Sequence, residues 1–168
     1  MESAAWKARY QRREAMIGRL ILTHGGLAQE LLAAADVISG HLASFEALSL
    51  DWSDGFEDAR VKVAAALERL DHGQGVLILT DMYGGTPNNI AMTFYQPGKV
   101  EVLTGVNLPM VLRLACQAGG VEGTVSDLAR ALQAKGQKSI CLAGDLIQKG
   151  KCMDSGALPV VVVGTKKG

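Results

Sequence analysis

Short apolar runs alternate with longer amphipathic stretches along most of this 168-residue chain. The apolar runs predict strands at residues 17–23, 45–50, 75–80 and 99–104. Helical spacing predicts helices from Leu27 to a stop signal at Gly40, and at residues 56–70, 88–95, 109–118 and 127–135. Two further segments, near Ile140 and at residues 158–163, could each add a strand.

Strands that alternate with helices pair in parallel through right-handed crossovers. The run GVLILT at residues 75–80 stays apolar until Thr80, which is typical of a strand buried on both faces of a sheet. We therefore expect an α/β fold, a three-layer helix–sheet–helix sandwich with a mainly parallel central sheet. Residues 1–15 are polar and charged, so we expect a disordered N-terminal extension there and a single domain at residues 16–168.

The composition is that of a globular protein, with 48% hydrophobic and 20% charged residues. The 17 basic and 17 acidic residues balance, which gives no support to a nucleic acid or an anionic membrane as partner. No stretch approaches the roughly 20 apolar residues of a membrane span, and the start of the chain lacks the features of a signal peptide. The three cysteines, Cys116, Cys141 and Cys152, form no CxxC pair. We predict a cytoplasmic protein with reduced thiols.

Three predicted strands end in unusual loops: THGG at residues 23–26, TDMYGGTP at residues 80–87 and TGVNLP at residues 104–109. Ligands of an open parallel sheet bind beyond the carboxyl ends of its strands. Because these loops should meet at that edge, we expect a functional site there.

His24 follows a strand and precedes Gly25 and Gly26, so its ring should stand at the sheet edge beside accessible backbone N–H groups. The positive end of the following helix should favour an anion at this place. A neutral imidazole can act as a nucleophile toward phosphorus near physiological pH. The alternative is a histidine that only caps the helix.

Asp81 ends the most buried strand, where an unpaired carboxylate would be costly. We expect it to accept a hydrogen bond from one nitrogen of His24, which would fix the tautomer and leave the other nitrogen facing the phosphate. The alternative is an aspartate that ties down its own loop.

The segment GGTP supplies a second anion cradle. Gly84 and Gly85 let the backbone approach closely, Thr86 offers a hydroxyl as helix N-cap, and Pro87 preorganises the helix. We expect Gly25, Gly84, Gly85 and Thr86 to hold phosphoryl oxygens. No ligand cluster calls for a metal or a cofactor, so catalysis should rest on positioning and electrostatics. The other histidines, His41 and His72, should be exposed and uninvolved.

Taken together, RLILTHGGLAQELLAAADVISG, GVLILTDMYGGTPNNIA and VEVLTGVNLPMVL resemble the enzyme IIA component of the mannose (mannose/fructose/sorbose) family of the bacterial phosphoenolpyruvate-dependent sugar phosphotransferase system. The resemblance runs from about Ile17 to about Leu146, with the motifs in the family's order and spacing.

The resemblance implies a phosphotransferase whose phosphorylated histidine is His24 and whose hydrogen-bonding aspartate is Asp81. Thr86 corresponds to a small hydroxyl residue of the family. The implied donor is the phosphohistidine of the carrier HPr, and the implied acceptor is a IIB component that phosphorylates incoming sugar. A homodimer with an exchanged C-terminal strand is also implied, although the chain after Gly144 matches the family poorly.

Three other functions would use a similar histidine. A phosphocarrier subunit of dihydroxyacetone kinase shares the fold and a strand-end histidine, but the segment GVNLPM favours the mannose type. A histidine phosphatase needs an arginine just before its histidine, where this chain has Thr23. A regulatory module whose phosphorylated His24 reports sugar supply would have the same loops, so the residues leave that alternative open.

Overall fold

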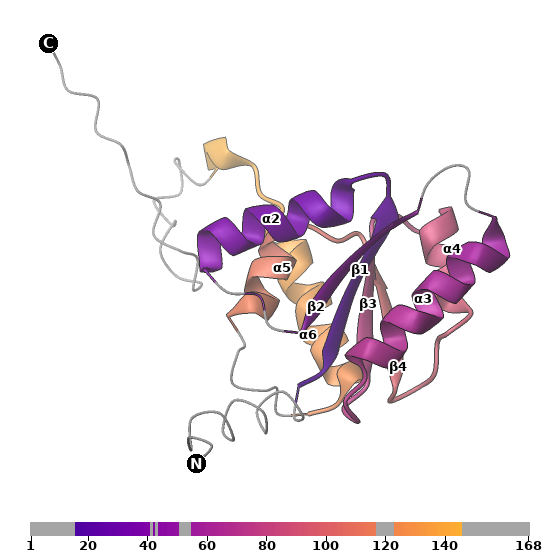
Figure 1. Ribbon diagram of the computed structural model, residues 1–168. Coiled ribbons are helices and arrows are strands. Elements are labelled where there is room, and N and C mark those ends of the chain that lie inside the picture. The colour runs from indigo at the N-terminus through magenta and orange to yellow at the C-terminus, as the bar shows by residue number, and fades with distance from the viewer. Residues whose placement is uncertain (1–15, 41, 43, 51–54, 117–122, 146–168) are drawn as a thin grey trace, which may run out of the picture.

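The computed structural model describes residues 16–40, 42, 44–50, 55–116 and 123–145. Within them four strands form one sheet: β1 (Gly18–His24), β2 (Phe45–Leu50), β3 (Val76–Thr80) and β4 (Val100–Thr104). Every neighbouring pair is parallel, and the order across the sheet is β2-β1-β3-β4 (Figure 1). β3 is buried along its whole length, as its unbroken apolar run predicted.

Five named helices of the described residues cover the two faces of this sheet. They are α2 (Leu27–Ser39), α3 (Phe56–Leu70), α4 (Thr86–Met92), α5 (Leu108–Ala115) and α6 (Val125–Lys138). In Figure 1, α2, α5 and α6 lie on one side of the sheet and α3 and α4 on the other. The predicted α/β architecture, a parallel sheet flanked by helices, is therefore confirmed.

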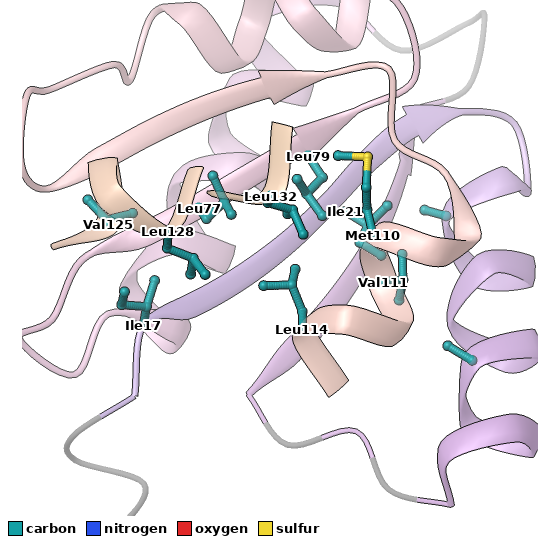
Figure 2. Close-up of a cluster of buried hydrophobic side chains, with 12 residues drawn as sticks. Ile17, Ile21, Leu77, Leu79, Met110, Val111, Leu114, Val125, Leu128 and Leu132 are labelled. Atoms are coloured by element: carbon teal, nitrogen blue, oxygen red, sulfur yellow. The ribbon is translucent and has the colours of Figure 1, made fainter. Parts of the chain in front are cut away.

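Each layer of helices closes its own apolar core. Ile21 of β1 and Leu79 of β3 face the larger core, into which Met110, Leu114 and residues of α6 pack (Figure 2). Side chains that point the opposite way from the same two strands meet α3 and α4 in the second core; they are Leu20, Leu22, Val76 and Ile78. Because successive strand residues face opposite sides, the middle of β1 (Leu20–Leu22) and all of β3 before Thr80 must be apolar.

Two helix starts differ from the sequence prediction. Thr86 was expected to cap α4, but Gly85 is the N-cap and Thr86 already lies inside the helix, because the N–H of Asn89 bonds the Gly85 carbonyl at 2.9 Å. α6 begins two residues before the predicted Asp127. There Thr124 and Asp127 form a capping box, in which each side chain bonds the other's backbone N–H.

The prediction of a possible strand near Ile140 is wrong. The chain stays in helical hydrogen bonding past α6, since the N–H of Ile140 donates to the Gln137 carbonyl at 3.3 Å. Ile140 is 81% exposed and lies outside the sheet. The predicted extension at residues 1–15 and the possible strand at residues 158–163 lie outside the described residues.

Candidate functional site

The sheet changes direction between β1 and β3. From β1 the chain passes through α2 to β2 on one side, whereas β3 pairs with the other side of β1. Such a switch point opens a crevice at the carboxyl ends of the two strands, which is where α/β proteins bind ligands. His24 ends β1 and Asp81 directly follows β3, so both predicted catalytic residues lie at this point.

His24 and Asp81 are joined by two hydrogen bonds. Nδ1 of the His24 ring lies 2.7 Å from Oδ2 of Asp81, and the backbone N–H of His24 donates to the same oxygen at 3.1 Å. The other carboxylate oxygen accepts from the backbone N–H of Met82 at 2.9 Å. The carboxylate is therefore fixed in rotation by three donors. Asp81 thus bonds both the histidine and its own loop, so the contacts that the two interpretations of Asp81 require are both present.

The charge state of Asp81 follows from these contacts. Burial at the sheet edge raises the pKa of its carboxyl, but the bonds from the His24 ring and from two backbone N–H groups outweigh burial and leave the pKa lowered. An ionised carboxylate can only accept hydrogen bonds, so the proton of the short bond sits on Nδ1 of His24. In the neutral ring the lone pair is then on Nε2.

Gly85 provides the surface against which the His24 ring lies. A Cβ atom built at Gly85 would stand 2.7 Å from Cε1 of His24 and 3.3 Å from its Nε2. Gly85 has an ordinary extended backbone, with φ −71° and ψ 164°, so the need for glycine here is steric. The Cε1–Nε2 edge of the imidazole therefore faces the backbone of the loop between β3 and α4.

The predicted oxygen-binding residues differ in how closely the structure connects them to the His24 ring. Gly84 and Gly85 belong to the loop beside the ring, and Thr86 is exposed at the start of α4. Gly25 adopts a left-handed backbone with φ +52°, but its N–H points toward the Leu50 carbonyl of β2 at 3.4 Å. We conclude that Gly25 turns the chain away from β1 and that its own N–H is partly engaged.

Thr23 has a role that the sequence interpretation missed. Its buried hydroxyl accepts a hydrogen bond from the N–H of Ala28 at 2.8 Å and so caps α2, whose N-cap Gly26 makes no side-chain bond. His24 thus lies between β1 and α2, and the hydroxyl of its neighbour Thr23 ties these two elements together. The side-chain cap that the structure shows for α2 comes from Thr23, the residue before His24.

The third loop meets the same edge, as predicted. The N–H of Val106 donates to the Thr80 carbonyl at 3.0 Å, and the Asn107 side chain caps α5 by accepting from the N–H of Met110 at 3.1 Å. These contacts hold the edge together. The Val106 N–H and the Asn107 side-chain oxygen are thus engaged in structural bonds that support the site.

The surroundings of the pair differ from those of the other histidines. The His24 side chain is 23% exposed and that of Asp81 14%. Three exposed apolar side chains follow the pair closely in the sequence: Leu27 at the start of α2, and Met82 and Tyr83 in the loop after Asp81. His72 is exposed in the turn between α3 and β3, at the opposite edge, as predicted. His41 lies outside the described residues.

The described residues show neither a metal-ion cluster nor a membrane-spanning helix. No three of their His, Cys, Asp and Glu side chains lie close enough together to hold a metal ion. Among the helices of this part of the chain, none combines the length and the apolar character that crossing a membrane requires.

Comparison with known proteins gives consistent matches. Residues 18–133 match the family described as "PTS system fructose IIA component". The fructose-specific EIIA component of Bacillus subtilis (strain 168) is 28% identical over 137 residues, which are 81% of this chain and 92% of that protein. The mannose-specific EIIAB component of Escherichia coli (strain K12) is 34% identical over 97 residues, 57% of this chain but 30% of that longer protein. The mannose/sorbose-specific IIA subunit of Enterococcus faecalis has a solved structure with a TM-score of 0.66 and 31% identity, covering 76% of this chain and 94% of that one.

Proposed function

The chain belongs to the mannose/fructose/sorbose family of EIIA components of the sugar phosphotransferase system, and we propose that His24 carries its phosphoryl group. The observation that supports this assignment best is the short bond between Nδ1 of His24 and Asp81 at the switch point of the sheet. That bond selects Nε2 as the nucleophile.

The transfer step uses only groups of the two proteins. The lone pair on Nε2 of His24 forms a bond to phosphorus while the phosphorus–nitrogen bond of the donor phosphohistidine breaks, and its electron pair returns to the donor ring. The proton on Nδ1 stays in place. Because His24 gains positive charge in this step, the ionised Asp81 beside it stabilises the product.

The phosphoryl oxygens would be held by the loop between β3 and α4. Gly84 and Gly85 expose backbone beside the ring, and Thr86 adds a hydroxyl. The N-terminus of α2, a 13-residue helix that begins at Leu27, contributes favourable potential for an anion. Gly25 contributes mainly by its turn. Catalysis is then positioning and electrostatics, as in other phosphoryl transfers.

The donor proposed here is phospho-HPr and the acceptor a IIB component, in the cytoplasm. A protein partner must reach a ring that is only partly exposed, and the apolar side chains Leu27, Met82 and Tyr83 around it suit such a contact. The phosphotransferase role is thus that of a carrier between two proteins, and the onward step to IIB serves sugar uptake.

A homodimer that exchanges its C-terminal segment also belongs to this proposal. β4 is one edge of the sheet formed by the described residues, and residues 158–163 (LPVVVV) are apolar enough to pair with a sheet. Deleting residues 157–168 should convert a dimer into monomers or aggregates, as measured by light scattering. A full-length chain that is monomeric at micromolar concentration would contradict the exchange.

Incubation with phosphoenolpyruvate, enzyme I and HPr tests the main assignment. The intact mass of the chain should rise by one phosphoryl group, and the label should be lost in acid and kept in base. His24→Ala should abolish the label completely because it removes the nucleophile.

Two matched variants complete this test. His41→Ala and His72→Ala remove the remaining histidines of the chain and should leave the label at its full level. Label that persists in His24→Ala, or that disappears in His72→Ala, would show that the phosphoryl group is carried elsewhere.

A further inference from the structure

Asn89 lies in the first turns of α4 but is bonded back to the loop before the helix. Its side-chain Nδ2 donates to the Gly84 carbonyl at 3.1 Å, and its backbone N–H donates to the Gly85 carbonyl at 2.9 Å. One residue therefore holds both carbonyl groups of the glycine pair. The backbone bond is part of the helix and any residue can make it, whereas the bond to Gly84 requires a side-chain donor.

The glycine pair needs such an anchor. Gly84 has a left-handed φ of +79°, and no atom lies within 4 Å of the place where its Cβ would be. Two successive glycines have more backbone freedom than any other pair of residues, and here no side chain of their own restricts it. The position of Gly84 therefore depends on the bonds made to its peptide groups.

That position matters because the next residue touches the imidazole. Gly85 lies so near the ring that a Cβ atom added to it would collide with Cε1 of His24 and crowd Nε2. A shift of the Gly84–Gly85 peptide would move this surface and allow the ring to rotate about its bond to Asp81. Phosphoryl transfer is sensitive to such displacements, because it depends on the alignment of the attacking atom.

The neighbouring asparagine has a different function. Asn88 is buried, and its Oδ1 lies 3.5 Å from the Thr80 hydroxyl, so it joins α4 to the end of β3. Asn89 is exposed and contributes nothing to either core. The contacts of Asn89 thus concern the loop and not the packing of the helix.

We propose that Asn89 is a positioning residue that fixes the Gly84–Gly85 turn against the His24 ring and thereby aligns Nε2 for phosphoryl transfer. The proposal deepens the phosphocarrier function and rests on it. Asn89 does not touch the reacting atoms in this arrangement. Its effect passes through the Gly84 carbonyl to the ring.

Asn89→Ala and Asn89→Asp test the proposal, because both remove the donor and the second keeps the shape of the side chain. The rate of phosphorylation by phospho-HPr should fall about 3- to 10-fold in kcat for each variant, the range expected for one lost hydrogen bond. KM for phospho-HPr should stay within about 2-fold of the parent value. Gln133→Ala, an exposed helical position in α6 on the other side of the sheet, is the matched control and should change neither constant.

A spectroscopic measurement separates positioning from contact with the partner. The Cε1–Hε1 resonance of His24 in the unphosphorylated chain should shift in both Asn89 variants and stay in place in Gln133→Ala. An unchanged kcat, a loss confined to KM, or an unmoved His24 resonance would each overturn the positioning role. The resonance needs no phosphoryl donor. A parent chain that takes no label would therefore overturn the phosphocarrier function, while the resonance still decides the role of Asn89.

Discussion

The amino ends of the strands form one edge of the sheet, the amino edge, and their carboxyl ends form the opposite one, the carboxyl edge. The two edges use the same residue types for different purposes. At the amino edge, a Cβ on Gly18 would meet the Leu70 carbonyl oxygen at 2.6 Å, and one on Gly75 would meet the Lys99 carbonyl oxygen at 2.3 Å. At the carboxyl edge, no atom lies within 4 Å of the corresponding positions of Gly25 and Gly84. At these four positions, glycine permits close packing of backbone at the amino edge and leaves the space beside the backbone open at the carboxyl edge, where Gly85 alone of the glycine pair is crowded, by the His24 ring.

Aspartates and histidines follow the same division. Asp71, at the amino edge, accepts the N–H groups of Gly73 and Gly75 and closes a turn. Asp81, at the carboxyl edge, accepts from a histidine side chain that is 57 positions away in the sequence. The comparison teaches that residue type alone does not mark a site here. The site is marked instead by a hydrogen bond that joins two strand ends at the switch point.

Replacing Asp81 should have the largest effect on transfer. In Asp81→Asn the amide can offer its NH₂ group to the ring, so the proton is no longer held on Nδ1 and the charge on phospho-His24 is no longer offset. The equivalent change in a hydrolytic triad costs about 10⁴ in rate. We expect a smaller loss of about 10³, because the donor is already activated. Rapid-quench measurement of phosphorylation by phospho-HPr gives the rate.

Asp71→Asn is the matched control at the other edge. It keeps an oxygen that can accept the two glycine N–H groups, so both the fold and the transfer rate should be those of the parent chain. Transfer at the parent rate by Asp81→Asn would mean that its carboxylate is only structural. The contrast between the edges would then fail.

Much of the fold follows from local pattern. The bounds of β2 and α3 agree with the predicted residues 45–50 and 56–70, because each segment has clear periodicity between turn residues. The meeting of His24 and Asp81 follows from the parallel sheet, since both stand at strand ends. The start of α6 was predicted two residues late, at Asp127, although the spacing of Thr124 and Asp127 is that of a capping box and marks the true start.

Other features depend on contacts that pattern does not encode. The fit of Gly85 against the His24 ring depends on how two loops pack across about 60 residues of chain. The bond from Asn89 to Gly84 depends on a side-chain direction. The engagement of the Gly25 N–H by Leu50 depends on the register between β1 and β2. These are tertiary features, and they decide which atoms near the ring remain available.

Replacing a glycine by alanine at each edge should distinguish an effect on the transfer rate from an effect on packing stability. Gly85→Ala has an allowed backbone but places Cβ against the His24 ring, which must move. We expect a loss of about 10² in transfer rate, typical of a displacement of about 1 Å, and a loss of stability of only about 1 kcal/mol because the ring is partly exposed. Transfer kinetics and urea unfolding measure the two effects.

Gly75→Ala should show the reverse. Its left-handed φ of +81° and the Lys99 carbonyl both oppose a Cβ atom, so strain and overpacking together should cost about 2–5 kcal/mol. Transfer per folded molecule should be unchanged. If Gly85→Ala lowered the free energy of unfolding and left the transfer rate unchanged, glycine would serve only packing at both edges.

The smallest expected effect concerns acid. At the carboxyl edge, burial raises the pKa of Asp81, but the bonds from His24 and Met82 outweigh burial and leave that pKa lowered. Near the amino end of β4, the pKa of Asp127 is lowered because the Thr124 backbone N–H and hydroxyl donate to its carboxylate. A carboxyl whose pKa is lower in the folded state binds its proton more readily when unfolded. Each therefore stabilises the fold above the unfolded pKa of about 3.9, and that stability is lost as pH falls below it.

The two edges should differ in how this acid sensitivity responds to salt. Asp127 is exposed, so solvent and salt should screen its charge-assisted bonds from Thr124 and its weaker attraction to Arg130, whereas Asp81 is partly buried and should be screened less. Urea unfolding between pH 7 and pH 3 should show a shallower acid decline in Asp81→Asn than in the parent chain at both low and high salt. In Asp127→Asn the decline should be shallower mainly at low salt. An acid decline in Asp81→Asn as steep as that of the parent would show that the pair at the carboxyl edge adds nothing to stability, and that its carboxylate serves His24 alone.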